Sequence, residues 1–262
     1  MGNWTEIEVG NLISGGSARN SQEPREEMRR ETRDAIISIA VFTLGMFIII
    51  MSNGAIVVLY SQRFNVDLLQ ATIETTKIVL IVNELVFLGL TILFVTKVFK
   101  MKVVDLGLSS IKLPSNIGLG LILGVAGYLA GTVFTAILNL FIPIEVPEWF
   151  LKALTATSPV DLLLLLALTW ILVGPCEEVF FRGFVQGTLT RWRGSTVGLV
   201  VGALIFGFAH YSPELWYRTL GAVFLGLIYG TVYLWRRSLI PVIVAHALND
   251  TIAFALAFLL LE

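Results

Sequence analysis

Charged residues are scarce in this chain of 262 residues, at 14% of the total, while hydrophobic residues make up 56% and the mean hydropathy is +0.84. A soluble domain typically carries about 25% charged residues, so the composition predicts an integral membrane protein. Basic patches of the kind that nucleic acids require are also absent from the sequence, so we expect no nucleic-acid partner. The single cysteine, Cys176, excludes an intrachain disulfide framework.

Residues 1–34 lack a long apolar run and are rich in charge. This composition predicts a mobile cytoplasmic tail without a secretory signal peptide, and its last part, 24–34, suits a short surface helix. Seven apolar segments follow, each near the ~20 residues that a bilayer requires. They cover about 35–60, 77–98, 117–143, 161–183, 195–212, 217–235 and 239–261. We therefore predict an all-α polytopic membrane helix bundle with about seven transmembrane helices, forming a single transmembrane domain over 35–262.

Lysine and arginine alternate between the segments that connect these predicted spans. The tail and the second, fourth and sixth connections together hold 13 lysine and arginine residues. The first, third and fifth connections hold only three, and Arg218 is the one in the fifth. The positive-inside rule then predicts a cytoplasmic N-terminus. Glycines four residues apart recur in the spans and predict close helix packing: Gly120 and Gly124, Gly127 and Gly131, Gly198 and Gly202, and Gly226 and Gly230.

The first polar unit within the spans is Glu177-Glu178-Val-Phe-Phe-Arg182. Ionisable side chains in hydrocarbon cost roughly 2.5–3.5 kcal/mol each on insertion scales, so they mark a polar pocket inside the bundle. Glu178 and Arg182 stand four residues apart, so their side chains meet on a helix and neutralise each other. Glu177 points about 100° away and has no such partner. We assign Glu177 to chemistry as a general base; alternatively, both glutamates belong to structural ion pairs.

Histidine is limited to two residues, and both lie in apolar sequence close to other polar groups. His210 ends the segment Phe206-Gly-Phe-Ala-His210, and His246 stands four residues before Asp250, hence on the same helix face. A histidine with a carboxylate one turn away can bind a metal, hydrogen-bond an oxyanion or orient a water molecule. Two such intramembrane histidines favour a functional site.

The spacing of these residues gives a geometric expectation. If the chain turns near Arg193–Gly194, Glu177 and His210 are each about 16 residues from the turn and lie at the same depth of a helical hairpin. His246 is only about 9 residues from the turn predicted at Arg236–Arg237. The depths then agree only if residues 184–192 bend along the membrane surface or the first hairpin projects into the cytoplasm.

Two weaker leads lie outside these units. Asn83 and Glu84 sit in the middle of the second span, where they either face the same cavity or form interhelical hydrogen bonds. Cys176 directly precedes Glu177, and a thiol nucleophile acting with His210 is conceivable. A buried cysteine far more often packs inertly, and nothing nearby in the sequence activates this thiol.

The three polar units, taken in order, resemble the three motifs of the CPBP family of intramembrane proteases. They are Glu177-Glu178-x-x-x-Arg182, Phe206-x-x-x-His210 and His246-x-x-x-Asp250. This family is related to type II CAAX prenyl endopeptidases and to bacteriocin-processing and self-immunity (Abi) proteins. The resemblance covers about residues 161–251, the expected catalytic core. Three ordered motifs on predicted spans form a specific signal.

The resemblance also implies a role for each residue. In that family, the first glutamate of the pair and the second-motif histidine activate a water molecule, and the third-motif histidine and the residue four positions later stabilise the oxyanion. Carried over, Glu177 is the base, His210 its partner, and His246 and Asp250 form the oxyanion side. The family often has asparagine where Asp250 stands. Because a carboxylate is a poor oxyanion donor unless protonated, Asp250 is alternatively a residue that orients His246; Asn249 lies about 100° off that face.

The residues leave open whether a metal takes part. Glu177, His210 and His246 could form a His₂Glu zinc site with an open position for water, which would make the chain a metalloprotease. Alternatively, Glu177 and His210 activate the water unaided. Zn²⁺ is the one cofactor that this pattern suggests.

The sequence thus predicts a hydrolase of the cell membrane, an intramembrane endopeptidase for hydrophobic or lipid-modified, CAAX-like peptides. The expected partners are a hydrophobic or prenylated peptide or protein substrate and membrane lipid. Two other functions stay open. One is a non-catalytic binding or self-immunity protein of the same family. The other is a proton-coupled transporter, since intramembrane Glu and His form proton relays, although the sequence has no duplicated halves of the kind many transporters show.

Overall fold

The computed structural model describes residues 23–108 and 111–261, and within these ranges it contains helices and no strand. The α-helices are α2 (Glu23–Phe64), α3 (Leu68–Leu93), α4 (Leu113–Phe141), α5 (Glu148–Leu154), α6 (Pro159–Leu168), α7 (Gly174–Glu178), α8 (Gly187–Ala209), α9 (Trp216–Arg236) and α10 (Ile240–Leu261). Three π-helices, η1 (Phe94–Val98), η3 (Thr169–Val173) and η4 (Val179–Gln186), and two 3₁₀-helices, η2 (Val103–Leu106) and η5 (Pro213–Leu215), complete the chain. The predicted all-α membrane bundle is confirmed.

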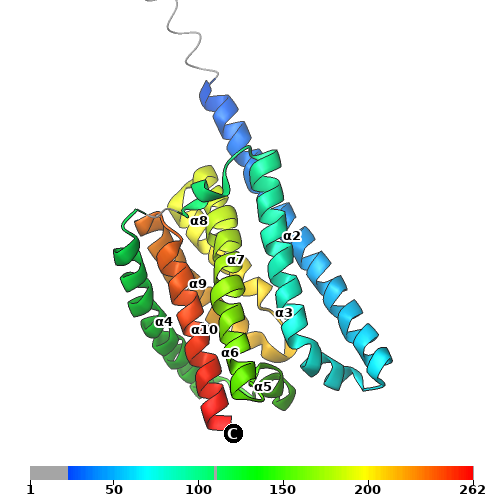
Figure 1. The fold of residues 1–262 in the computed structure, drawn as a ribbon. Coiled ribbons are helices and arrows are strands. Elements are labelled where there is room, and N and C mark those ends of the chain that lie inside the picture. Colours follow the sequence, from blue (N-terminus) through cyan, green and yellow to red (C-terminus); the bar gives the residue numbers. More distant parts are fainter. Residues whose placement is uncertain (1–22, 109–110, 262) are drawn as a thin grey trace, which may run out of the picture.

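The helices form a bundle in which the run from α6 to α7 lies between two pairs (Figure 1). On one flank α2 packs beside α3, and on the other α4 packs beside α10. Helix α3 also contacts α7 and η4, and α10 contacts α6 and α7. The central run therefore touches both flanks, and Cys176 and Glu178 in α7 are buried, whereas Val160 and Leu163 in α6 stay exposed.

Six described helices are long and apolar enough to cross a bilayer: 24–64, 68–98, 113–141, 159–209, 213–236 and 240–260. The number differs from the seven predicted spans because the fourth and fifth belong to one helical run of 51 residues, Pro159–Ala209. Within this run the backbone leaves helical geometry at Arg193 and Gly194, where Gly194 has φ 85° and ψ 172°. Glycine tolerates this conformation because it has no Cβ.

The break at Gly194 turns the long run into a hairpin, as predicted. A Cβ on Gly202 would lie 3.0 Å from Cβ of Gln186, and one on Gly198 would collide with Thr190. Each pair is equally spaced on the two sides of Gly194, as in an antiparallel hairpin. The two arms correspond to the two spans predicted for this region.

The predicted tail over residues 1–34 divides into two parts. Residues 1–22 lie outside the described residues, so the prediction of a mobile segment there is untested. From Glu23 onward the chain is helical and continues without a break into the first span, which makes α2 42 residues long. The short surface helix predicted for 24–34 is therefore the first part of α2 and not a separate element.

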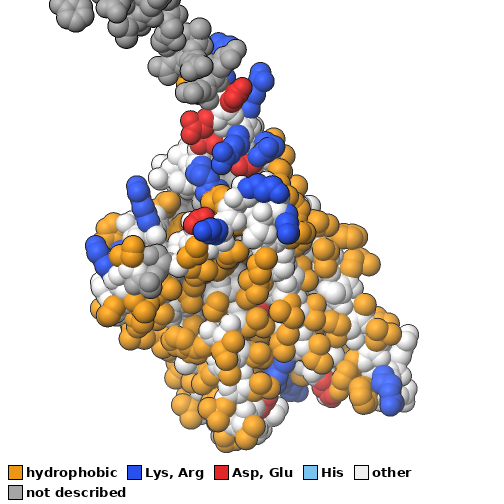
Figure 2. All heavy atoms as spheres, turned by 45° about the horizontal axis from the view of Figure 1, so that its top comes forward, with side chains coloured by type: hydrophobic (Ala, Val, Ile, Leu, Met, Phe, Trp, Pro, Cys, Tyr) orange, Lys and Arg blue, Asp and Glu red, His pale blue; other side chains and the backbone are white. Residues whose placement is uncertain are grey.

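Hydrophobic side chains cover much of the face seen in Figure 2, and many charged side chains gather at the end where α2 begins. Contacts bring together segments that carry the excess of lysine and arginine. The Trp192 indole donates a hydrogen bond to Thr32 Oγ1 (3.1 Å), and Arg236 donates to Asn116 Oδ1 (2.7 Å). Connections rich in lysine and arginine therefore lie at one end of the bundle, and connections poor in them lie at the other. The positive-inside rule rests on this difference between the two ends. The cytoplasmic placement of the N-terminus stays a prediction.

Glycines form the contact between α4 and α10, the helix that carries His246. A Cβ on Gly120 would lie 2.6 Å from Cβ of Val244, and one on Gly124 would lie 2.8 Å from Cβ of Leu248. Both partners advance by four residues together, so the two helices run parallel. The Gly120–Gly124 pair is therefore a packing seam, as predicted, and it lets the two backbones approach closely.

We predict that Gly120→Ala destabilises the protein by about 1–3 kcal/mol, the usual range for overpacking, because the added methyl meets Val244 and the Pro241 carbonyl at 2.6–2.7 Å. Gly118→Ala in the same helix is the matched control, since a Cβ there meets nothing within 4 Å. Thermal unfolding of the two variants in detergent measures the difference. Equal melting temperatures for both would contradict the tight α4–α10 contact.

Candidate active site

The two glutamates of the first motif lie in α7, a short α-helical stretch between the π-helices η3 and η4. Pro175 near the start of α7 has no N–H, so it cannot donate to a carbonyl one turn earlier. The turn before it widens to a π-helix, a feature that often occurs at functional sites. Every residue of η4 is buried, so this arm is fixed in the centre of the bundle.

Glu178 connects the first motif with the third. Its Oε1 lies 3.1 Å from Arg182 Nη1 and accepts a hydrogen bond from His246 Nδ1 at 2.7 Å. The exposed fractions of Glu178, Arg182 and His246 are only 0%, 2% and 7%. The predicted Glu178–Arg182 pair is confirmed. The contact between Glu178 and His246 was not predicted from the sequence, because the two residues lie on separate helices.

Arg182 connects the first motif with the second. Its guanidinium carbon lies 3.9 Å from the ring centroid of Phe206, the residue that opens the second motif. This is a cation–π contact, which stabilises a buried cation without a second carboxylate. The Phe206 ring also packs edge-on against Phe181 in η4, with the centroids 5.1 Å apart. Arg182 and Glu178 therefore tie all three motifs into one cluster.

The second nitrogen of His246 faces two further carboxylates. His246 Nε2 lies 3.5 Å from Asp250 Oδ2 and 3.9 Å from Glu177 Oε2. His246 and Asp250 share a face as predicted, but Glu178 makes the shortest contact with the ring and fixes its orientation. Asn249 donates a hydrogen bond to Asp250 Oδ1 (3.1 Å) and borders a different hollow, in line with its expected position off that face.

One cavity of about 620 Å³ brings the predicted catalytic residues together. Glu177, His210, His246 and Asp250 all border it, whereas Glu178 and Arg182 lie behind its wall. Glu177 Oε2 is buried, and among the described residues it has no hydrogen-bond partner. The site therefore presents a carboxylate oxygen that accepts no hydrogen bond from these residues to a hollow between apolar helices.

His210 is placed by the end of α8, where it caps the helix. Its Nδ1 lies 2.9 Å from the Phe206 carbonyl oxygen. A carbonyl oxygen only accepts, so Nδ1 carries the hydrogen and Nε2 of the neutral ring is left as an acceptor. This arrangement suits a group that orients a water molecule.

Helix α3 adds a carboxyl group that the sequence indicated only weakly. Asn83 and Glu84 both border the cavity, which confirms the first of the two alternatives considered for them. The Glu84 side chain is 2% exposed, and its carboxyl group interacts directly with that of Glu177. The signal in the sequence was an ionisable residue in the middle of a span, which is costly unless it faces a polar cavity.

The predicted zinc ligands do not form a metal site in this arrangement. Within residues 23–108 and 111–261, no group of three or more His, Cys, Asp and Glu side chains is placed to hold a metal ion. A catalytic zinc needs three protein ligands at about 2.0–2.3 Å, but His246 Nε2 lies 3.9 Å from Glu177 Oε2 and nearer to Asp250 Oδ2, at 3.5 Å. The set Glu177, His210 and His246 therefore does not fit zinc, and the expectation of a metalloprotease is not supported.

The comparison with known families gives one match. Residues 159–252 match the family described as Type II CAAX prenyl endopeptidase Rce1-like. The matched segment begins with α6, ends within α10 and contains all six predicted site residues. No curated protein and no solved structure matches the chain. The match supports a protease of the CAAX type, and together with the long apolar helices it indicates a multi-pass membrane protein. Residues 159–252 are thus similar to the Rce1-like family, in agreement with the CPBP family that the three motifs resemble.

Proposed function

We propose that this protein is an intramembrane endopeptidase of the cell membrane that hydrolyses peptide bonds of hydrophobic or lipid-modified, CAAX-like substrates. The observation that supports it best is the convergence of Glu177, His210 and His246 on one cavity between apolar helices. These residues lie in the segment that matches the Rce1-like family. Polar groups buried at such cost are characteristic of functional sites in membrane proteins.

In the proposed reaction, Glu177 acts as the general base. Its carboxylate takes a proton from a water molecule while the water oxygen attacks the carbonyl carbon of the scissile bond. His210 Nε2 accepts a hydrogen bond from the same water and orients it, because Nδ1 is held by the Phe206 carbonyl. Glu177 then gives the proton to the leaving amine, and the carbon–nitrogen bond breaks to leave a new carboxyl terminus and a new amino terminus.

His246 stabilises the oxyanion that forms on the carbonyl oxygen. The hydrogen bond from Nδ1 to Glu178 fixes the ring, and Nε2 lies 3.5 Å from Asp250 Oδ2 and 3.9 Å from Glu177 Oε2. Three carboxylates surround this imidazole, which favours a ring that donates from both nitrogens. A fixed donor in a water-poor site is worth more than one in bulk water because it needs no reorganisation during the reaction. Asp250 supports the charge on the ring at 3.5 Å from Nε2.

We predict that Glu177→Gln lowers the rate of peptide cleavage by about 10²–10⁴-fold, because the amide cannot take a proton from water. The measurement is cleavage of a pooled library of hydrophobic and farnesylated peptides by purified protein, read by mass spectrometry. Glu27→Gln on the exposed surface of α2 is the matched control and retains full activity.

Glu177→Gln also separates the proposal from the two other functions. A binding or self-immunity protein would be favoured by two results together: the wild type cleaves no peptide, and Glu177→Gln keeps the phenotype of the gene. Proton uptake coupled to solute transport in proteoliposomes, lost in Glu177→Gln, would favour a transporter. Either result would contradict the peptidase.

We predict that Glu178→Gln lowers kcat by roughly 10- to 100-fold, the range for losing one hydrogen bond to a charged group. The carboxylate that orients His246 is replaced by an amide of the same shape, while Glu177 and His210 are untouched. Steady-state kinetics and a melting curve test this together. A loss of activity that only follows a loss of folded protein would argue against the orienting role.

We predict that chelators leave the initial rate of cleavage unchanged, because the three predicted ligands do not fit zinc. The rate is measured after dialysis against 1,10-phenanthroline and again after addition of Zn²⁺. Inhibition that Zn²⁺ reverses would overturn the unaided mechanism and restore the His₂Glu alternative.

A further inference from the structure

Arg218 is a cation in the wall of the active-site cavity that the proposed reaction does not use. It lies in the first turn of α9 and borders the same cavity as Glu177 and His246. Its guanidinium carbon stacks over the ring of Phe150 in α5, 4.8 Å from the centroid. It is close enough to Asp250 and Glu177 to interact with them electrostatically. Arg218 was counted as a loop cation in the sequence, but the structure places it in the site.

The guanidinium of Arg218 has no anionic partner in the described part of the chain. No carboxylate oxygen lies within 4.0 Å of it there, and no hydrogen bond from it is formed. An arginine within a membrane-spanning helix is costly unless it pairs or serves a function. The half-buried guanidinium is therefore free to pair with an anion.

Three acids that could pair with Arg218 make other contacts. Glu214 stands four residues before it, the usual spacing for a helical ion pair, but accepts a hydrogen bond from the Trp149 indole (2.9 Å). Glu148 pairs with Lys152 at 2.7 Å. Asp250 faces His246 and accepts a hydrogen bond from Asn249. The local sequence thus leaves the guanidinium free while holding α5 against the start of α9.

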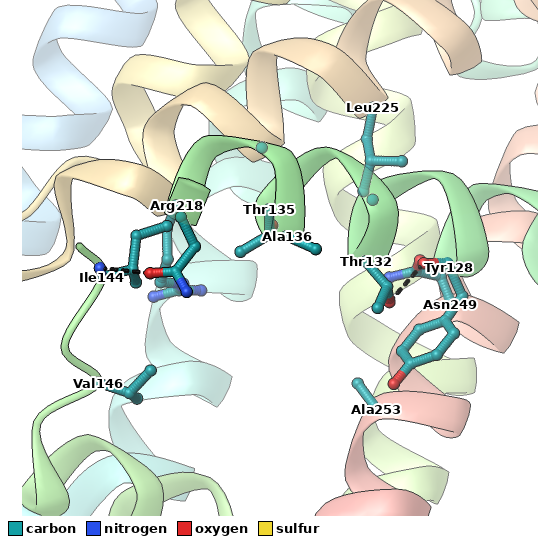
Figure 3. Close-up of a pocket in the computed structure, with 13 residues that line it drawn as sticks. Tyr128, Thr132, Thr135, Ala136, Ile144, Val146, Arg218, Leu225, Asn249 and Ala253 are labelled. Atoms are coloured by element: carbon teal, nitrogen blue, oxygen red, sulfur yellow. Dashed lines mark hydrogen bonds between the residues drawn. The ribbon is translucent and has the colours of Figure 1, made fainter. Parts of the chain in front are cut away.

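The other cation that borders the cavity is already neutralised. Lys77 Nζ lies 2.9 Å from Asp161 Oδ1. A second hollow of about 660 Å³ lies between α4, α9 and α10. Arg218 and Ala253 border both this hollow and the active-site cavity. Figure 3 shows Arg218 near Ile144 at one end of this second hollow, with Tyr128 and Asn249 toward the other end. Arg218 therefore stands where the two hollows meet.

We propose that Arg218 binds the free C-terminal carboxylate of the peptide substrate and thereby sets the specificity of the site. A guanidinium offers a planar fork of donors that matches a carboxylate with two parallel hydrogen bonds. The cavity extends from Glu177 and His246 to Phe150, on which Arg218 stacks, so a short peptide can reach from the reacting carbonyl to the guanidinium. This inference rests on the proposed peptidase function and names the end of the substrate that the site recognises.

The test compares peptides that differ only at the C-terminus, as a free acid or as an amide, in detergent without phospholipid. Wild type, Arg218→Gln and Arg218→Lys are assayed for kcat and KM. The exposed, ion-paired Lys152 is outside the cavity wall, so Lys152→Gln is the matched control for loss of a cation. Wild type is expected to prefer the acid by roughly 10- to 100-fold in kcat/KM, mostly through KM, as one charge-assisted contact allows. Arg218→Gln should lose this preference, Arg218→Lys should keep part of it, and Lys152→Gln should keep all of it.

A second arm measures binding without cleavage. The same labelled peptides are titrated against Glu177→Ala and against Glu177→Ala/Arg218→Gln by fluorescence anisotropy. Acid-selective binding that Arg218→Gln removes supports the inference even if no peptide is cleaved, in which case only the peptidase proposal fails.

Three results would overturn the inference. The first is equal use of acid and amide by the wild type. The second is a preference for the acid that persists in Arg218→Gln. The third is selective binding of another anion, either an internal Asp or Glu side chain of the peptide or an anionic phospholipid added back to the detergent. Arg218 would then bind that anion and not the C-terminal carboxylate. Absence of both cleavage and acid-selective binding would overturn the inference and the proposed function together.

Discussion

The site depends on one buried carboxylate, that of Glu178. It contacts Arg182 on its own helical run and His246 on α10, and all three side chains are almost fully buried. Taking charges out of water costs several kcal/mol per ion unless each finds a partner. Glu178 therefore has to meet both residues at once, and this requirement fixes the depth of the α7 arm against α10. The side chains that face the cavity, Glu177 and Asp250, are placed as a consequence.

Two backbone features allow the charged cluster to form between apolar helices. The π-helices beside α7 alter the spacing of side chains around the two glutamates, and the first of them ends just before Pro175, which cannot donate a backbone hydrogen bond. Small residues then let neighbouring helices close on the cluster, as at Gly120 and Gly124 against α10. In a bilayer such contacts are favoured by dispersion and shape rather than by removal of water. Aromatic rings fill the remaining space, and Phe206 covers Arg182 directly.

Much of the fold and site was predictable because the signals are local. Apolar length predicted the spans, the spacing of Glu178 and Arg182 predicted their pair, and the turn at Gly194 predicted equal depth for Glu177 and His210. Contacts between helices far apart in sequence were not predictable, since no pattern within one helix reports them. The hydrogen bond between Glu178 and His246 is of this kind, and so is the position of Arg218 in the cavity wall. The contact between Glu178 and His246 brings the first and third motifs together although they lie at unequal distances along the chain from their nearest turns.

The central claim is that an activated water, and not a side chain, attacks the peptide bond. The most direct measurement is turnover of a cleaved peptide in H₂¹⁸O, with the enzyme quenched during the reaction and its intact mass recorded. We predict one ¹⁸O in the new carboxyl terminus and an enzyme of unchanged mass. An enzyme population that carries the mass of the acyl fragment would reveal a covalent intermediate, for example on Cys176, and would contradict the account.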